Sequence, residues 1–164
     1  MKKSDQSIHK ICIAAIERHT MTPYNFQLTA FYEDGKSANL EAFSEITLTE
    51  TELPICSTYI SIDQWTLLTT QRIISKEGVV VHEHTIESFK QKFSGNFKGL
   101  GGKKVETGRL ELLTGEICPY YIETGAASMV MIYGIQTIQQ INPKSQIDLE
   151  VMEKRYKKRG FLEG

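Results

Sequence analysis

Apolar residues recur at the spacing of one helix face in two stretches of the chain. The first lies within residues 1–22, where Ser4 or Ser7 can cap a helix and Pro23 follows its end. Its apolar face is formed by Ile8, Cys12, Ala15, Ile16 and His19. The second stretch, residues 126–141, is more apolar and stops at Asn142-Pro143. This spacing predicts an N-terminal helix, a long amphipathic helix over 126–141 and a further helix over 145–160.

Alternating apolar and polar residues fill the chain between the first two helices and predict β-strands. The dipeptides Asp34-Gly35 and Thr114-Gly115 mark the turns of two hairpins. Between the hairpins we expect a strand from Tyr59 to Thr69 and a return strand over 79–86. Residues 71–75 begin another strand or continue the first one past a bend. Residues 87–93 suit a short helix or a loop, and five glycines in residues 94–108 indicate a mobile connection or a wide hairpin end. Residues 23–141 are therefore expected to form one β-rich domain.

One part of this domain carries a family resemblance: WTLLTTQRIISKEGVVVHEHTIESF, residues 65–89. A strand that ends in the phrase LLTTQRII turns through Gly78 and returns toward Ile86. In this order the piece resembles the bacterial pleckstrin-homology-like (GRAM-like) domains. The resemblance covers residues 57–141, with no counterpart for the glycine-rich insert or for the N-terminal hairpin. It implies an α+β fold, in which a bent antiparallel sheet or partial barrel is closed by the long amphipathic helix.

Two residues of this piece are candidates for either a structural or a ligand-binding role. A guanidinium is costly to bury in a strand unless ion pairs or carbonyl groups satisfy it, so we expect Arg72 to have such partners. Trp65 is the only tryptophan, and a large aromatic residue in a strand is typical of a core anchor. For both residues the structural role is favoured over ligand binding.

The composition is that of an ordinary globular domain. The chain has 164 residues, of which 40% are hydrophobic and 24% charged. No apolar run approaches the ~20 residues of a membrane-spanning helix, and charged residues interrupt the apolar part of the N-terminus. The three cysteines are far apart and odd in number, which argues for buried thiols and against a disulfide framework. We therefore expect a cytoplasmic protein with no transmembrane segment.

The charge is unevenly distributed along the chain. Residues 1–88 carry a balance of −5 and residues 89–164 a balance of +4. The candidate residues for binding a partner or a lipid are Lys90, Lys92, Phe97, Lys98, Lys103 and Lys104. Cations interleaved with apolar residues suit an acidic protein or an anionic lipid surface better than nucleic acid. An acidic face for a partner is predicted from Glu41, Glu45, Glu50 and Glu52. Opposite charges would also let two copies pair head to tail.

Other motifs give weaker indications. His82 and His84 share one strand face, but no further metal-ligand cluster accompanies them, so we expect no metal and no cofactor. Lys103-Lys104 precedes a strand-like segment instead of a helix, which excludes a phosphate-binding loop. The basic run over 154–159 is typical of a solvated helix end. With no catalytic set in view, the sequence favours a non-catalytic module that binds a protein, or an anionic lipid surface. An immunity protein that neutralises a toxin, and a small enzyme, remain the alternatives.

Overall fold

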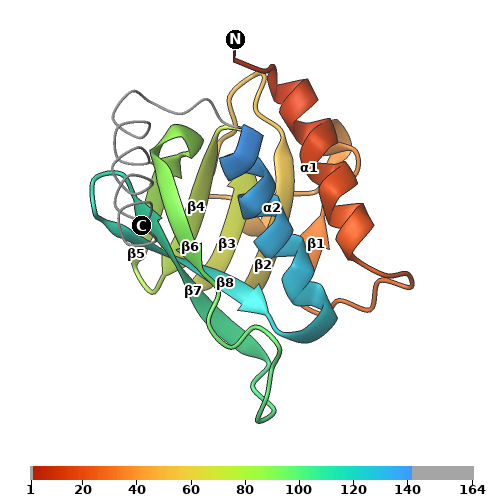
Figure 1. Cartoon of the computed structure of the whole chain (residues 1–164). Helices are drawn as coiled ribbons and strands as arrows, with labels where there is room; N and C mark the ends of the chain where they lie inside the picture. Colours follow the sequence, from red (N-terminus) through yellow and green to blue (C-terminus); the bar gives the residue numbers. More distant parts are fainter. Residues whose placement is uncertain (1, 142–164) are drawn as a thin grey trace, which may run out of the picture.

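The chain forms two antiparallel β-sheets and two α-helices in a computed structural model that describes residues 2–141 (Figure 1). The five-stranded sheet has the order β1-β2-β3-β4-β5 and consists of Thr29–Phe31, Pro54–Ser61, Gln64–Thr69, Arg72–Glu77 and Val80–Thr85. The three-stranded sheet has the order β6-β7-β8 and consists of Phe89–Phe93, Val105–Leu112 and Ile117–Glu123. The helices are α1, Asp5–His19, and α2, Ser128–Ile141. The α+β class and the antiparallel sheets are confirmed, but the strands divide into two sheets and do not close a barrel.

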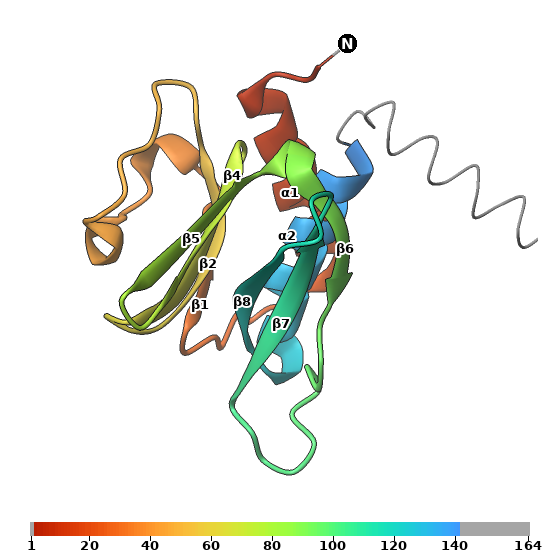
Figure 2. The same cartoon turned by 90° about the vertical axis from the view of Figure 1, so that its left-hand side faces the viewer.

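The main core lies where α1, α2 and both sheets meet (Figure 2). Helix α2 packs against α1 and against strands of both sheets. Its apolar residues Val130, Met131 and Ile135 are fully buried. Gly134 lies close to the sheet, because an added Cβ would be 3.0 Å from Sγ of Cys56 and 3.1 Å from a methyl group of Leu68. The predicted long helix therefore covers the sheets as expected.

A second, smaller core lies on the opposite face of the five-stranded sheet. Trp65, 2% exposed, packs there with Leu67 and Ile74. The ring of Phe43 meets the indole edge-on, with ring centroids 5.0 Å apart. Trp65 is therefore a core anchor, as predicted, but it faces the segment around Phe43, whereas α2 lies on the other side of its sheet.

Strand β8 runs across the inner face of the five-stranded sheet, the face directed at α2. The edge of β8 that does not pair with β7 forms a hydrogen bond to the five-stranded sheet. There, the N–H of Tyr121 donates to Oγ1 of Thr66 at 2.9 Å. Thr66 is in turn 2.7 Å from the hydroxyl of its cross-strand neighbour Ser75. Two residues earlier on the same edge stands Pro119, which has no N–H to satisfy. Threonine and serine on this sheet face thus receive the edge of the second sheet.

Three sequence predictions about the strands are wrong. Asp34-Gly35 is not a hairpin turn: the Asp34 carboxylate accepts bonds from the Lys36 N–H and the Ser37 hydroxyl, which begins a short 3₁₀ helix, Gly35–Ser37. The preceding alternation yields only β1, which pairs with β2. The strand expected over 59–69 is broken by a turn at residues 62–63, which separates β2 from β3. In the segment 87–93, only the first two residues belong to a short 3₁₀ helix, Ile86–Ser88, and the rest form strand β6.

The other expected helices and strands within the described residues are observed, and the segment from Gln71 begins a new strand, β4. The N-terminal helix is capped by the Ser4 hydroxyl, which accepts a bond from the Ser7 N–H at 3.2 Å. The return strand is β5, the hairpin at Thr114-Gly115 joins β7 to β8, and the glycine-rich segment forms the wide end of the β6–β7 hairpin. The helix expected over 145–160 and the basic run over 154–159 lie outside the described residues.

Candidate functional site

The connection between β6 and β7, residues 94–104, is the largest projection from the described body (Figures 1 and 2). We name it the glycine–lysine loop. Leu100 is 73% exposed on it. Lys98, Lys103 and Lys104 are also exposed. The loop thus presents one apolar side chain among three cations.

Hydrogen bonds inside the glycine–lysine loop give it a defined shape. The Asn96 side-chain amide donates to the Leu100 carbonyl at 3.0 Å, and the Gly99 N–H donates to the Asn96 carbonyl at 3.2 Å. Gly101 and Gly102 have φ of 88° and 82°, a region that side chains disfavour. The glycines therefore specify the path of the loop.

The loop is also anchored to the body at its base. The Thr124 hydroxyl donates to the Lys103 carbonyl at 2.6 Å, and the Gly125 N–H donates to the Phe97 carbonyl at 2.9 Å. The half-buried Phe97 ring packs against the main core. Of the two structures predicted for this segment, the wide hairpin end is the one observed, with an internal hydrogen-bond pattern.

The carboxylates nearest to the loop are already engaged. Glu106 accepts bonds from the backbone N–H groups of Asn96 and Thr107, and it lies 3.5 Å from the Lys103 amine. Burial acts to raise the pKa of Glu106, but these donors outweigh it and lower the pKa. Glu123 similarly accepts three bonds from residues 27–29. Neither Lys98 nor Lys104 forms an ion pair with a described residue, so the loop surface remains cationic.

The other predicted basic-site residues lie elsewhere. Lys90 and Lys92 belong to strand β6 and are only half exposed. Lys90 pairs with Glu111 at 3.4 Å. Burial lowers the pKa of Lys92. The structure therefore brings together Phe97, Lys98, Lys103 and Lys104 in the loop and separates the two strand lysines from them.

Only two of the four glutamates of the predicted acidic face are free of ion pairs with described residues. Glu52 is 4% exposed, so its assignment to a surface is wrong. Its carboxylate binds Nε of Arg72 at 2.8 Å and the Thr69 hydroxyl at 3.1 Å. Glu45 pairs with Lys76 at 2.5 Å. Glu41 and Glu50 remain exposed.

Arg72 is satisfied by the ion pairs expected of it. Beside Glu52, its Nη1 binds Glu83 at 2.6 Å and its second terminal nitrogen donates to the Thr47 carbonyl at 2.8 Å. The hydrogen bond to Glu52 is the main cause of a raised Arg72 pKa. The guanidinium thus ties β4 to the segment that precedes β2, which is a structural role.

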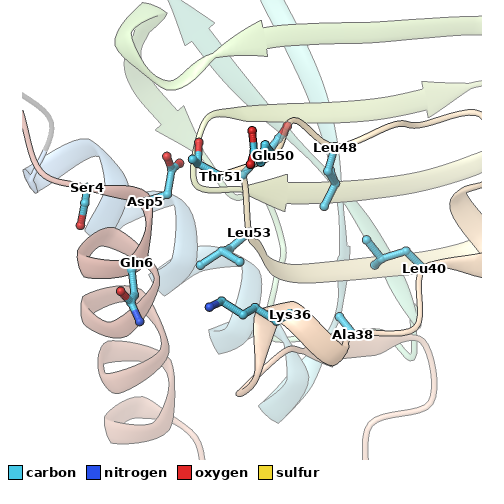
Figure 3. A pocket seen from close by; sticks show the side chains of 12 residues that line it. Ser4, Asp5, Gln6, Lys36, Ala38, Leu40, Leu48, Glu50, Thr51 and Leu53 are labelled. Carbon is cyan, nitrogen blue, oxygen red and sulfur yellow. The ribbon is translucent and has the colours of Figure 1, made fainter.

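A cavity of about 670 Å³ opens beside the first turn of α1 (Figure 3). Ser4, Asp5 and Gln6 line it from the helix, opposite Lys36 and Leu53. Leu40, Leu48, Glu50 and Thr51 complete much of the wall. The Asp5 carboxylate is held by the Thr70 hydroxyl at 2.5 Å and by the Gln71 amide at 3.4 Å. The cavity combines apolar and polar walls, and the half-buried Asp5 carboxylate on it serves a structural contact.

Histidine and cysteine side chains show no arrangement for metal chemistry in residues 2–141. No group of three or more His, Cys, Asp or Glu side chains suited to a metal ion occurs there. The three cysteines are unpaired and buried, as predicted. Burial raises the pKa of Cys12 and of Cys118 to about 12, and it raises that of Cys56 still further. These thiols are packing residues.

An exposed apolar cluster at one end of the five-stranded sheet was missed from the sequence. It consists of Ile62, Val79, Val80 and Val81, exposed by 70%, 96%, 51% and 40%. Ile62 lies in the β2–β3 turn and Val79 in the β4–β5 turn, and the Gly78 N–H joins the turns by donating to the Asp63 carbonyl at 2.9 Å. We name this cluster the apolar tip. Recognising a turn at residues 62–63 would have predicted this cluster, but the residues on both sides of the turn are strand formers and the turn was not predicted.

Comparison with known proteins gives no further assignment: no family model, curated protein or solved structure matches this chain. Neither of the helices in residues 2–141 has the length and apolar character needed to cross a membrane.

Proposed function

We propose that this protein is a non-catalytic binding module that recognises an acidic surface of a protein partner through the glycine–lysine loop. The observation that carries the proposal is the exposure of Leu100 among three lysines, beside carboxylates that are already bound internally. We also propose that the domain has a pleckstrin-homology-like fold. Its support is the run of seven strands, β2 to β8, split four and three between two sheets and followed directly by α2.

The expected binding free energy favours a protein partner over a lipid surface. A lysine near an anionic membrane contributes about 1 kcal/mol, so three lysines supply about 3 kcal/mol. That is weaker than a millimolar dissociation constant, which corresponds to about 4 kcal/mol. A folded partner can add shape complementarity to a loop whose path is fixed by glycines and internal bonds. An anionic membrane is therefore the second candidate, supported by the exposed Leu100.

The immunity-protein alternative rests on fewer residues than the sequence indicated. Its acidic surface is reduced to Glu41 and Glu50, because Glu45 and Glu52 are engaged by Lys76 and Arg72. We also propose a cytoplasmic location, supported by three unpaired thiols in a chain that forms no disulfide among its cysteines.

Site-specific photocrosslinking tests the proposed partner. A photoreactive residue replaces Leu100, and a matched control places it at Glu17, which is also exposed, on α1. In cells that produce the protein, we expect a discrete covalent adduct with an acidic protein from position 100 only. The triple variant K98E/K103E/K104E should abolish that adduct. Equal labelling from both positions, or an adduct that survives the charge reversal, would refute the proposal.

Vesicles separate the two candidates. Sedimentation with phosphatidylcholine vesicles containing 30% phosphatidylserine should leave the wild-type protein in solution at 150 mM salt. Binding that vanishes in the triple variant and in Leu100→Ala would replace the protein partner by a membrane.

A further inference from the structure

Two sheets have four edge strands, and three of these are protected against pairing with another strand. Strand β1 has only three residues. Strand β6 carries Lys90 and Lys92 and has a register shift between Phe89 and Gln91. Strand β8 contains Pro119, and its free edge is covered by the five-stranded sheet through the hydrogen bond to Thr66. Short length, lysines, bulges, prolines and covered edges are the usual means by which proteins prevent edge-to-edge association.

Strand β5 has none of these protections. Its six residues pair with β4 without a register shift, and they include neither lysine nor proline. No described strand pairs with its other edge. The β4–β5 connection has two residues, so Val80, His82 and His84 exchange hydrogen bonds with β4. The donation from the Ile86 N–H to the Gln71 carbonyl continues this alternation.

The alternation leaves the N–H and C=O groups of Val81 and Glu83, and the N–H of Thr85, directed at the open edge. The Thr85 carbonyl instead accepts a bond from the Ser88 hydroxyl at 2.6 Å. The open groups are spaced for the main chain of one further strand. Only the turn end of this edge carries apolar side chains, those of Val79, Val80 and Val81 in the apolar tip. An open edge flanked by exposed valines combines main-chain pairing with side-chain contacts, the two features of strand addition.

The charges around the edge indicate the chemistry of the added strand. Glu83 is the only acidic or basic residue on β5 apart from the histidines. Its Oε1 binds Arg72 at 2.6 Å, and its Oε2 has no hydrogen bond to a described residue. The cations nearby are largely enclosed: the side chains of Arg72 and Lys76 are 16% and 12% exposed, against 64% for Asp63. The accessible charge at this edge is therefore negative.

We propose that β5 accepts an extended segment of another protein as a sixth strand of the sheet, with apolar residues opposite Val80 and Val81 and a lysine or arginine opposite Glu83. This second binding site goes beyond the proposed function: it consists of other residues than the glycine–lysine loop, and its accessible charge has the opposite sign. The contact uses the main chain for affinity and alternate side chains for selection.

A synthetic peptide provides the test. The probe is a nine-residue peptide of alternating valine and threonine with lysines at its centre and ends. Matched peptides replace the central lysine with glutamate or carry N-methyl groups along one edge. With ¹⁵N-labelled full-length protein, we expect the amides of Val81, Glu83 and Thr85 to shift and to exchange more slowly, whereas those of His82 and His84 change little. The N-methylated peptide should have no effect.

Two protein variants complete the experiment. Val81→Lys should weaken peptide binding by about fivefold, the size of a strong cross-strand pair. Leu100→Lys makes the same change at an exposed apolar residue of the glycine–lysine loop and should leave peptide binding unchanged, so the two proposals fail separately. The absence of shifts at millimolar peptide would overturn the inference. Slow exchange of the three amides in the free protein would overturn it as well, since the edge would already be occupied by the chain itself or by a second copy.

Discussion

Replacing Glu52 by glutamine isolates the buried half of the Arg72 ion-pair network. Two carboxylates bind the same guanidinium: the side chain of Glu52 is fully buried, whereas that of Glu83 is 52% exposed. Glu52→Gln keeps the size of the side chain and removes its charge. Glu83→Gln makes the identical change in solvent and is the matched control.

The expected magnitude follows from burial. Removing one partner of a fully buried ion pair costs about 3–5 kcal/mol. Here Arg72 is 16% exposed and retains Glu83 and the Thr47 carbonyl, which lowers the expected loss for Glu52→Gln to about 2–3 kcal/mol. An exposed ion pair contributes less than about 1 kcal/mol, which sets the limit for Glu83→Gln.

Urea unfolding at pH 7 measures both values. With a slope of about 2 kcal/mol per molar urea, Glu52→Gln should lower the midpoint by about 1 M or slightly more, and Glu83→Gln by less than half of that. Added salt at 0.5 M should reduce the effect of Glu83→Gln and leave that of Glu52→Gln nearly unchanged. If the two variants lose equal stability, the inference that burial governs this network is wrong.

Three further outcomes are expected. The buried thiols, with pKa values raised to about 12 or above, should resist iodoacetamide at pH 8 and react fully only in guanidinium chloride. Gly108→Ala should destabilise the fold by about 1–3 kcal/mol in thermal unfolding, because its Cβ would lie 2.3 Å from the ring of Tyr120. The lowered pKa of Glu106 stabilises the base of the loop above a glutamate's ordinary value of about 4.3 and is lost as the pH falls through the lowered value, so protection of the Asn96 and Thr107 amides should decline there.

The long amphipathic patterns were read correctly from the sequence because burial of one face dominates their local preferences. Helix α2 occupies residues 128–141, close to the predicted 126–141. The glycine turn at 115 was equally clear, since Gly115 has φ of 90°. Asp34-Gly35 carried the same signal, yet there the Asp34 side chain bonds to its own turn and the following residues cover Trp65. Tertiary burial overrode the hairpin signal.

The sites were harder to predict than the elements, because a side chain's role depends on its partners. Glu41, Glu45, Glu50 and Glu52 look alike in sequence, and only the position of Arg72 separates the buried Glu52 from the rest. The apolar tip depends on a turn at residues 62–63 that carries neither glycine nor proline. In contrast, the exposed lysines of the glycine–lysine loop were recognisable because no acidic residue accompanies them between residues 90 and 104.

The tetrapeptide Thr69-Thr70-Gln71-Arg72 places a set of stabilising contacts at the opposite end of β4 from the apolar tip. It forms the turn between β3 and β4, where Thr70 and Gln71 hold Asp5 of α1 and Arg72 holds Glu52. In an antiparallel sheet the β4–β5 turn lies at the other end of β4, and six residues span roughly 20 Å. Substitutions separated by more than about 10 Å usually act independently. Glu52→Gln should therefore weaken the fold without changing the apolar tip, whereas Val81→Lys should alter pairing at the open edge and leave the free energy of unfolding nearly unchanged. A variant that moved both quantities together would show that the sheet couples its two ends.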